Sequence, residues 1–200
     1  MLSHIRPALV LLVLLSALTG LAYPLAITGI AQVALKGAAD GSLITRDGVV
    51  VGSSLIGQNF TSAKYFHGRP SATQAPDPKD ATKTVDAPYN AANSTGSNLG
   101  PTSQKLMDRV KDATKGAKSP VPADSLTTSA SGLDPHVSPE NAMSQVDAVA
   151  KARGVKAAKV RALVESRVEG RALGLIGEPR VNVLELNLAL DTEFATSAAK

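Results

Sequence analysis

An uninterrupted apolar stretch near the amino terminus constrains this chain more than any other feature. From Pro7 to Leu35, the phenol of Tyr23 is the only ionisable side chain. About 20 apolar residues in a helix span a hydrocarbon core roughly 30 Å thick, and residues 8–31 supply that length. We therefore predict one transmembrane helix over about residues 8–31, within an amino-terminal segment of residues 1–35.

A cleaved secretory signal peptide is the alternative interpretation of this stretch. Arg6 would be its short basic region, and Gly20-Leu21-Ala22 would offer small residues for cleavage. The apolar pattern continues past Ala22 to Val33, however, which is longer than a signal peptide requires. The length therefore favours a permanent membrane helix.

The charges of the chain indicate an orientation and exclude one class of partner. Arg6 precedes the apolar stretch, whereas the charges that follow it, Lys36, Asp40, Arg46 and Asp47, nearly cancel. The positive-inside rule therefore favours a cytoplasmic amino terminus and extracytoplasmic residues 36–200. The 21 basic residues are scattered among 17 acidic ones. Without a basic stripe, we expect no nucleic-acid partner.

Residues 36–200 are expected to form a single mixed α+β domain. Apolar residues around the turn Arg46-Asp47-Gly48 predict a hairpin within residues 41–51. Residues 73–95 are rich in Pro, Asp, Asn, Ser and Thr, and we predict an exposed irregular loop there.

Helical periodicity predicts four helices, near residues 101–116, 122–129, 138–154 and 156–169. The third has the clearest boundaries, because Ser138 is suited to the N-cap, Pro139 to the first turn and Gly154 to the C-terminal end. Gln145 lies beside the apolar face of this helix, where an ordinary surface amide would be expected.

The carboxyl-terminal run of residues 181–190 alternates large apolar residues with polar or small ones from Leu184 onward. A period of two predicts a half-buried strand. Asn182 followed by Glu185 would instead suit the start of a helix, so this alternative stays open.

The search for catalytic and metal-binding patterns is negative. The chain has no glycine-rich phosphate loop and no dinucleotide fingerprint. Its three histidines lack metal-ligand spacing, and we predict neither catalytic nor metal-binding residues. The stretch from Ser129 to His136 holds the residue types of a catalytic triad, but a polar turn is the simpler interpretation.

Three segments, residues 57–71, 89–101 and 124–135, combine glycine with amide, hydroxyl and aromatic groups. They could form a loop-rich core held by side-chain hydrogen bonds, or a rigid surface that contacts a partner. The candidate partner-contact residues are Gln58, Asn59, Phe60, Tyr65, Phe66, His67, Arg69, Tyr89, Asn98, Ser131 and Asp134.

Distinctive blocks occur in one order along almost the whole chain. They include Tyr23-Pro24-Leu25, Leu55-Ile56-Gly57-Gln58-Asn59-Phe60, Tyr65-Phe66-His67-Gly68-Arg69-Pro70-Ser71, Thr128-Ser129-Ala130-Ser131-Gly132-Leu133-Asp134 and Val183-Leu184-Glu185-Leu186-Asn187-Leu188-Ala189-Leu190-Asp191. On these blocks the chain resembles the C subunits of Kdp-type potassium-transporting P-type ATPases.

The resemblance implies a non-catalytic accessory subunit in the bacterial inner membrane, surrounded by membrane lipid. Its partners would be a catalytic P-type ATPase subunit, which hydrolyses ATP, and a channel-like subunit, which binds potassium. The subunit would assemble or stabilise the complex, and as a catalytic chaperone it would raise the ATP affinity of the catalytic subunit. In the family a helix glutamine is proposed to touch nucleotide, and the matching residue is Gln145.

The predicted orientation conflicts with direct nucleotide binding, because it puts Gln145 across the bilayer from cytoplasmic ATP. An indirect effect needs no nucleotide site, since a subunit that binds one conformer of a pump shifts its population. A pure assembly adaptor fits the residues equally well. A free-standing, membrane-anchored binding domain of the cell envelope is the alternative outside the family.

Overall fold

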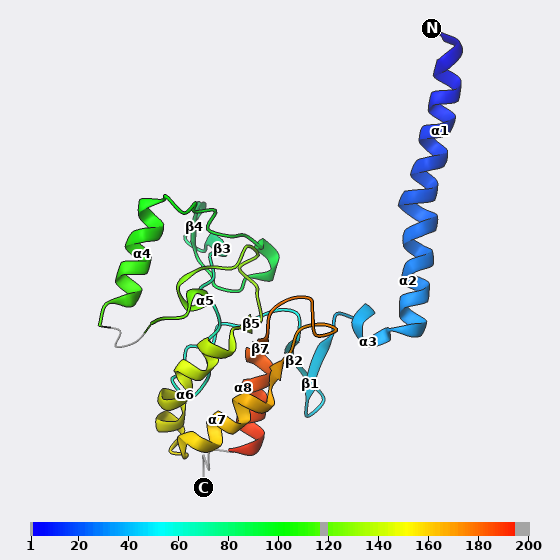
Figure 1. Cartoon of the computed structure of the whole chain (residues 1–200). Helices are drawn as coiled ribbons and strands as arrows, with labels where there is room; N and C mark the ends of the chain where they lie inside the picture. The colour runs from blue at the N-terminus through cyan, green and yellow to red at the C-terminus, as the bar shows by residue number, and fades with distance from the viewer. Residues whose placement is uncertain (1, 117–119, 195–200) are drawn as a thin grey trace. The chain divides into compact units, whose positions relative to one another are not determined.

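A computed structural model describes residues 2–116 and 120–194 of the chain (Figure 1). The chain divides into two compact units, residues 1–53 and residues 54–200, which are described separately below. The first unit holds a long apolar helix and a small hairpin, and the second is a mixed helix and sheet domain.

The apolar stretch of the first unit forms one continuous helical segment from Ile5 to Ala34. A short 3₁₀ turn, η1 (Leu2–His4), precedes this segment. The segment itself consists of α1 Ile5–Ala17, η2 Leu18–Ala22 and α2 Tyr23–Ala34. Its mean hydropathy reaches 2.2 over 18 residues, and none of that window is buried. By length and composition it is a candidate membrane-spanning helix, as the sequence predicts.

The middle of this helix is a π-helical turn, η2, at Leu18–Ala22. Pro24 follows at the start of α2. Proline has no N–H to donate, and its ring crowds the carbonyl four residues earlier, so wider hydrogen bonding before Pro24 relieves the clash. The helix therefore passes the proline without breaking.

The predicted hairpin is confirmed. After the short helix α3 (Lys36–Ala39), strands β1 (Leu43–Arg46) and β2 (Val49–Ser53) pair antiparallel. Asp47 and Gly48 both have positive φ, 52° and 79°, which is the geometry of the tight turn that best matches strand twist.

The second unit has its apolar core between three helices and a small sheet. Figure 1 shows the helices α6, α7 and α8 side by side at one end of the unit. Their bounds are α6 Pro139–Arg153, α7 Ala157–Ser166 and α8 Val183–Glu193, and the strands are β5 His136–Val137, β6 Val168–Glu169 and β7 Arg180–Asn182. The sheet is antiparallel in the order β5-β7-β6. These elements confirm the α+β class.

Helix α6 has the boundaries predicted from its capping residues. The Ser138 hydroxyl accepts a hydrogen bond from the Asn141 N–H at 3.1 Å, and Gly154 ends the helix with a φ of 68°. The predicted apolar face is buried, as Val146 shows with no exposed area. Helix α7 is shorter than predicted, because Val168 leaves the helix and pairs with Val181 in the sheet.

The strand predicted over residues 181–190 is wrong. Only Arg180–Asn182 is a strand, and Val183–Glu193 is helix α8. The Asn182 side chain accepts a hydrogen bond from the Glu185 N–H at 3.2 Å, so the open alternative of a helix cap is correct. The alternation misled because α8 is buried around most of its circumference, which hides the helical period.

The irregular loop predicted for residues 73–95 is also wrong in part. Strands β3 (Gln74–Asp77) and β4 (Asp80–Asp86) form a mostly exposed antiparallel hairpin there. Asp77 stabilises its turn by accepting a hydrogen bond from the Lys79 N–H at 2.8 Å. Backbone pairing needs no large apolar side chains, so composition did not reveal the hairpin.

Of the remaining helices, α4 lies at the other end of the unit (Figure 1). Their bounds are η3 Ala91–Asn93, α4 Gln104–Thr114 and α5 Ala123–Leu126. The last two confirm the predicted helices at residues 101–116 and 122–129.

Candidate functional site

Two side-chain amides hold the segment Tyr65–Ser71, which we call the 65–71 loop. Gln145 on α6 accepts a hydrogen bond from the His67 N–H at 2.8 Å and donates to the His67 carbonyl at 3.1 Å. Asn187 on α8 accepts from the Phe66 N–H and donates to the Phe66 carbonyl, both at 2.9 Å. We call these two pairs of bonds the amide clamps. They fix two consecutive residues of the loop through their backbone atoms.

The start of the loop is tied to the carboxyl-terminal ends of α6 and α8. The Tyr65 hydroxyl donates to Asp191 at 3.0 Å, and the Arg153 guanidinium lies 4.8 Å from the centre of the Tyr65 ring. Arg153 also donates to the Lys64 carbonyl at 2.6 Å and pairs with Asp191 at 2.8 Å. Burial and then the bond to Asp191 raise the pKa of Tyr65.

Arg69 ties the other end of the loop to the segment before β5. Its guanidinium pairs with Asp134 at 3.0 Å and donates to the carbonyl of Thr128 at 3.3 Å. Burial alone would raise the pKa of Asp134, but hydrogen bonds from His136 and the Arg69 guanidinium outweigh burial and hold this pKa at about 2. Asp134 is therefore a stable carboxylate that anchors Arg69.

Tyr89 packs against the loop where only glycine leaves room. Its hydroxyl donates to the Arg69 carbonyl at 2.7 Å. A Cβ at Gly68 would collide with the Tyr89 oxygen, and one at Gly57 would collide with its ring. Burial, with a contribution from the negative charge of Asp134, raises the pKa of Tyr89 to about 12, so this hydroxyl keeps its proton at physiological pH.

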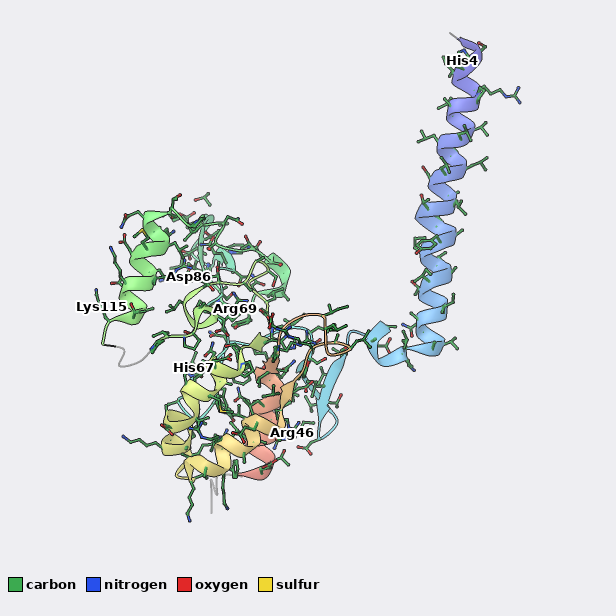
Figure 2. All side chains as sticks on the ribbon, in the orientation of Figure 1. His4, Arg46, His67, Arg69, Asp86 and Lys115 are labelled. Carbon is green, nitrogen blue, oxygen red and sulfur yellow. The ribbon has the colours of Figure 1, made fainter. Side chains whose placement is uncertain are left out.

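The loop lines a polar cleft of about 540 Å³ in the second unit. Figure 2 marks His67 and Arg69, which contribute to its wall. The cleft brings together seven of the residues named from the sequence: Gln58, Asn59, Phe60, His67, Arg69, Tyr89 and Gln145. They come from the segments 57–71 and 89–101 and from α6, so the fold gathers distant parts of the chain.

The other named residues lie elsewhere. Phe66 is fully buried in the apolar core, so its ring anchors the loop to that core. Tyr65 and Asp134 support the loop, as described above. Asn98 and Ser131 are exposed outside the cleft wall, and the Ser131 hydroxyl accepts a hydrogen bond from the Leu133 N–H at 3.1 Å.

Sequence reasoning missed the residues that grip the loop from the helices: Asn187, Arg153 and Asp191. The one available signal was Asn187, a polar residue within the apolar run of residues 183–190. A buried amide needs hydrogen-bond partners, which could have pointed to a backbone segment elsewhere.

The stretch with triad residue types forms a polar turn. The Ser129 hydroxyl accepts a hydrogen bond from the Gly132 N–H at 2.8 Å, and the His136 ring lies 3.6 Å from Asp134. Across residues 2–116 and 120–194, no group of three or more His, Asp or Glu side chains could hold a metal ion. The site thus offers the neutral amides of Gln145 and Asn187, the hydroxyl of Tyr89 and the positively charged guanidinium of Arg69, which is paired with Asp134.

These features define a class of protein: a chain with one candidate membrane helix and an α+β domain that presents a preorganised polar cleft. The sequence model of the family described as K+-transporting ATPase, C chain, matches residues 5–192. The chain therefore belongs to the KdpC family of potassium-transporting ATPase subunits. This membership and the candidate helix together indicate a membrane location.

Curated relatives agree over nearly the full length. A protein of Bradyrhizobium diazoefficiens named potassium-transporting ATPase KdpC subunit is 64% identical over 200 residues, which cover 98% of this chain and 100% of the relative. Proteins of the same name from Methylobacterium nodulans and Rhodopseudomonas palustris are each 62% identical over 196 residues, covering 96% of this chain and 98% of each relative.

Proposed function

We propose that this chain is a non-catalytic accessory subunit of an ATP-driven, high-affinity potassium uptake complex. Its helix crosses the inner membrane with the amino terminus in the cytoplasm, and residues 36–200 form the extracytoplasmic domain. Its partners are a catalytic P-type ATPase subunit and a channel-like subunit that binds potassium. Family membership supports the complex, and the charges around the helix support the orientation.

The amide clamps are the observation that carries this proposal. They use both backbone polar groups of Phe66 and of His67, so the 65–71 loop is ordered before any partner arrives. A preordered loop loses little conformational entropy on binding, which favours affinity. His67 of the loop is exposed, and so is Asn59, which lines the same cleft. We place the contact with the potassium-binding subunit on this surface.

The hydrogen bonds of Gln145 favour a positioning role in ATP affinity. Its amide already makes three bonds, two to the His67 backbone and one to Asn141 at 2.9 Å. A change at Gln145 would alter the loop and, through it, the conformer of the pump that the subunit prefers. ATP affinity then changes by coupling between distant sites, and nucleotide need not touch this chain.

The test compares two variants that loosen the loop from opposite sides. Gln145→Ala removes one amide clamp, and Tyr65→Phe removes the bond to Asp191, which lies on a different helix. In the purified complex, we expect both variants to raise the KM for ATP while retaining ATP hydrolysis. Lys115→Ala, on the exposed end of α4, is the control and should match the wild type.

The outcomes distinguish a positioning role of Gln145, direct contact with nucleotide and a purely structural role of the subunit. A higher KM for ATP with Gln145→Ala alone would contradict positioning and support direct contact with nucleotide. Loss of assembled complex in both loop variants would support a purely structural adaptor. Unchanged KM, potassium affinity and yield in both variants would remove the 65–71 loop from the function of the subunit.

Direct nucleotide binding is a second candidate, favoured by the cleft itself. Its volume of about 540 Å³ is in the range of small-molecule sites, and Arg69 and Ser71 line it together with Gln145. Equilibrium dialysis of the full chain in detergent with labelled ATP tests this candidate. Binding that is lost with Gln145→Ala would support it, and no binding would exclude it.

A further inference from the structure

An aliphatic tip projects from the segment of residues 170–179, which connects β6 to β7 and which we call the 170–179 loop. Leu173, Leu175 and Ile176 are exposed by 92%, 81% and 68% of their surface. Three large aliphatic side chains within four residues are seldom left in water without a role, because an apolar patch with a polar rim marks an interaction site.

Hydrogen bonds within the loop hold its backbone in the shape that exposes these side chains. Ala172 and Ile176 exchange two backbone hydrogen bonds, at 2.8 and 3.0 Å. Below them, Arg171 pairs with Glu178 at 2.7 Å and closes the base. Leu173 holds a φ of 53°, which a leucine adopts only when its surroundings require it. The turn thus keeps the aliphatic side chains outward at a cost in backbone strain.

We propose that the 170–179 loop inserts its aliphatic tip into the interfacial region of the lipid bilayer. The proposal rests on the membrane anchoring through Ile5–Ala34 proposed above. The tip would be a second, shallow membrane contact of the same chain, made by the α+β domain.

The hydrogen bonding of the tip favours lipid over a protein partner. Between Ala172 and Gly177 no side chain carries a hydrogen-bonding group. Protein interfaces form about one hydrogen bond per 100–200 Å² and favour aromatic and arginine anchors, whereas acyl chains offer no polar partner. A wholly aliphatic tip is therefore better suited to contact acyl chains than to bind a protein partner.

Four of the five backbone N–H groups of residues 172–176 are satisfied within the loop. The N–H groups of Ala172, Gly174, Leu175 and Ile176 all donate to carbonyls within the loop. A segment that enters hydrocarbon must satisfy its backbone internally, because no water is there to do so.

The base of the loop suits the headgroup layer. Arg171–Glu178 and Arg180–Glu169 are ion pairs of 2.7 and 2.9 Å, and both arginines remain about half exposed. Arginine side chains can keep their charged ends at the interface while apolar neighbours go deeper.

A single-tryptophan experiment tests the proposal, because the natural chain has no tryptophan. Leu175→Trp places the fluorophore on the tip of the full chain. Leu12→Trp, in the anchor helix, is the positive control, and Met107→Trp, on exposed α4, is the negative control. Each variant is reconstituted into phosphatidylcholine and phosphatidylglycerol vesicles, with or without brominated acyl chains. Circular dichroism verifies that each is folded.

We expect brominated lipid to quench Leu175→Trp by about half, as suits a shallow insertion of 5–10 Å, and to leave Met107→Trp unchanged. Quenching of Leu12→Trp without quenching of Leu175→Trp would overturn the loop proposal and leave the anchor intact. A blue-shifted but unquenched Leu175→Trp would indicate a protein contact and would also overturn it. An unquenched Leu12→Trp would remove the anchoring and, with it, the loop proposal.

Discussion

The two halves of the second unit are stabilised in different ways. Apart from Phe66, all the hydrophobic residues buried among those described in this unit lie in residues 136–194, the half that contains α6, α7 and α8. The half of residues 54–135 is held by directional bonds, such as Arg69 to Asp134 and Tyr89 to the Arg69 carbonyl. Apolar packing supplies stability without fixing direction, whereas hydrogen bonds fix geometry. The half that supplies most of the cleft wall is thus the one whose geometry is fixed by hydrogen bonds and an ion pair.

The largest expected effect comes from Phe66→Ala, which breaks the link between the two halves. The ring is fully buried in the helical core although it belongs to the loop-rich half. We expect a loss of about 3–5 kcal/mol in the free energy of unfolding. Urea unfolding of the full chain in detergent would measure it. Leu55→Ala, at a residue 61% exposed, should cost less than about 0.5 kcal/mol; equal effects would contradict the comparison.

Arg69→Ala should affect mainly the loop-rich half. It leaves Asp134 and the Thr128 carbonyl without the guanidinium, and we expect a cost of about 2 kcal/mol. Hydrogen exchange should increase around residues 65–71 and 127–134, while the core of α8 stays protected. Lys83→Ala, which removes an exposed pair with Asp80, is the control. Equal loosening of α8 would show that the halves do not respond separately.

The pH dependence of stability sharpens the comparison further. The pKa of Asp134 is lowered to about 2 in the folded chain, so the carboxylate form stabilises the fold. This contribution is complete above the ordinary carboxyl pKa of about 4 and is lost as the pH falls toward about 2. Asp134→Asn should remove that part of the acid destabilisation, as urea titrations between pH 6 and pH 2 would measure. An unchanged acid profile would contradict the role of the Arg69–Asp134 pair.

The smallest effect is expected for Glu178→Gln. Its pair with Arg171 is exposed on the 170–179 loop, and such surface pairs contribute about 0–1 kcal/mol. Thermal unfolding should hardly differ from that of the wild type. A loss comparable with that of Arg69→Ala would mean that the 170–179 loop takes part in the stability of the unit.

Local signals in the sequence predicted the elements that depend on local chemistry. Ser138, Pro139 and Gly154 define α6 through bonds to neighbours a few residues away. The long apolar stretch and the turn at Asp47 and Gly48 are equally local. The helix α6, the apolar helix and the turn are confirmed as predicted, because the residues concerned act on backbone groups within their own segment.

The cleft could be predicted only in part. The sequence pointed to the segments that form it, because their amides, hydroxyls and glycines exceed what a core needs. It could not reveal the clamp between Phe66 and Asn187, which are 121 residues apart, since no periodicity relates them. The strand predicted for residues 181–190 hid this clamp further, because Asn187 faces Phe66 only when α8 is a helix.

The amide clamps separate the position of the 65–71 loop from the identity of its side chains. Gln145 and Asn187 hold the backbone N–H and carbonyl groups, which every amino acid except proline has. The exposed side chain at position 67 can therefore be exchanged while the loop stays where it is. Recognition of a partner can diverge at this position without any redesign of the supporting helices.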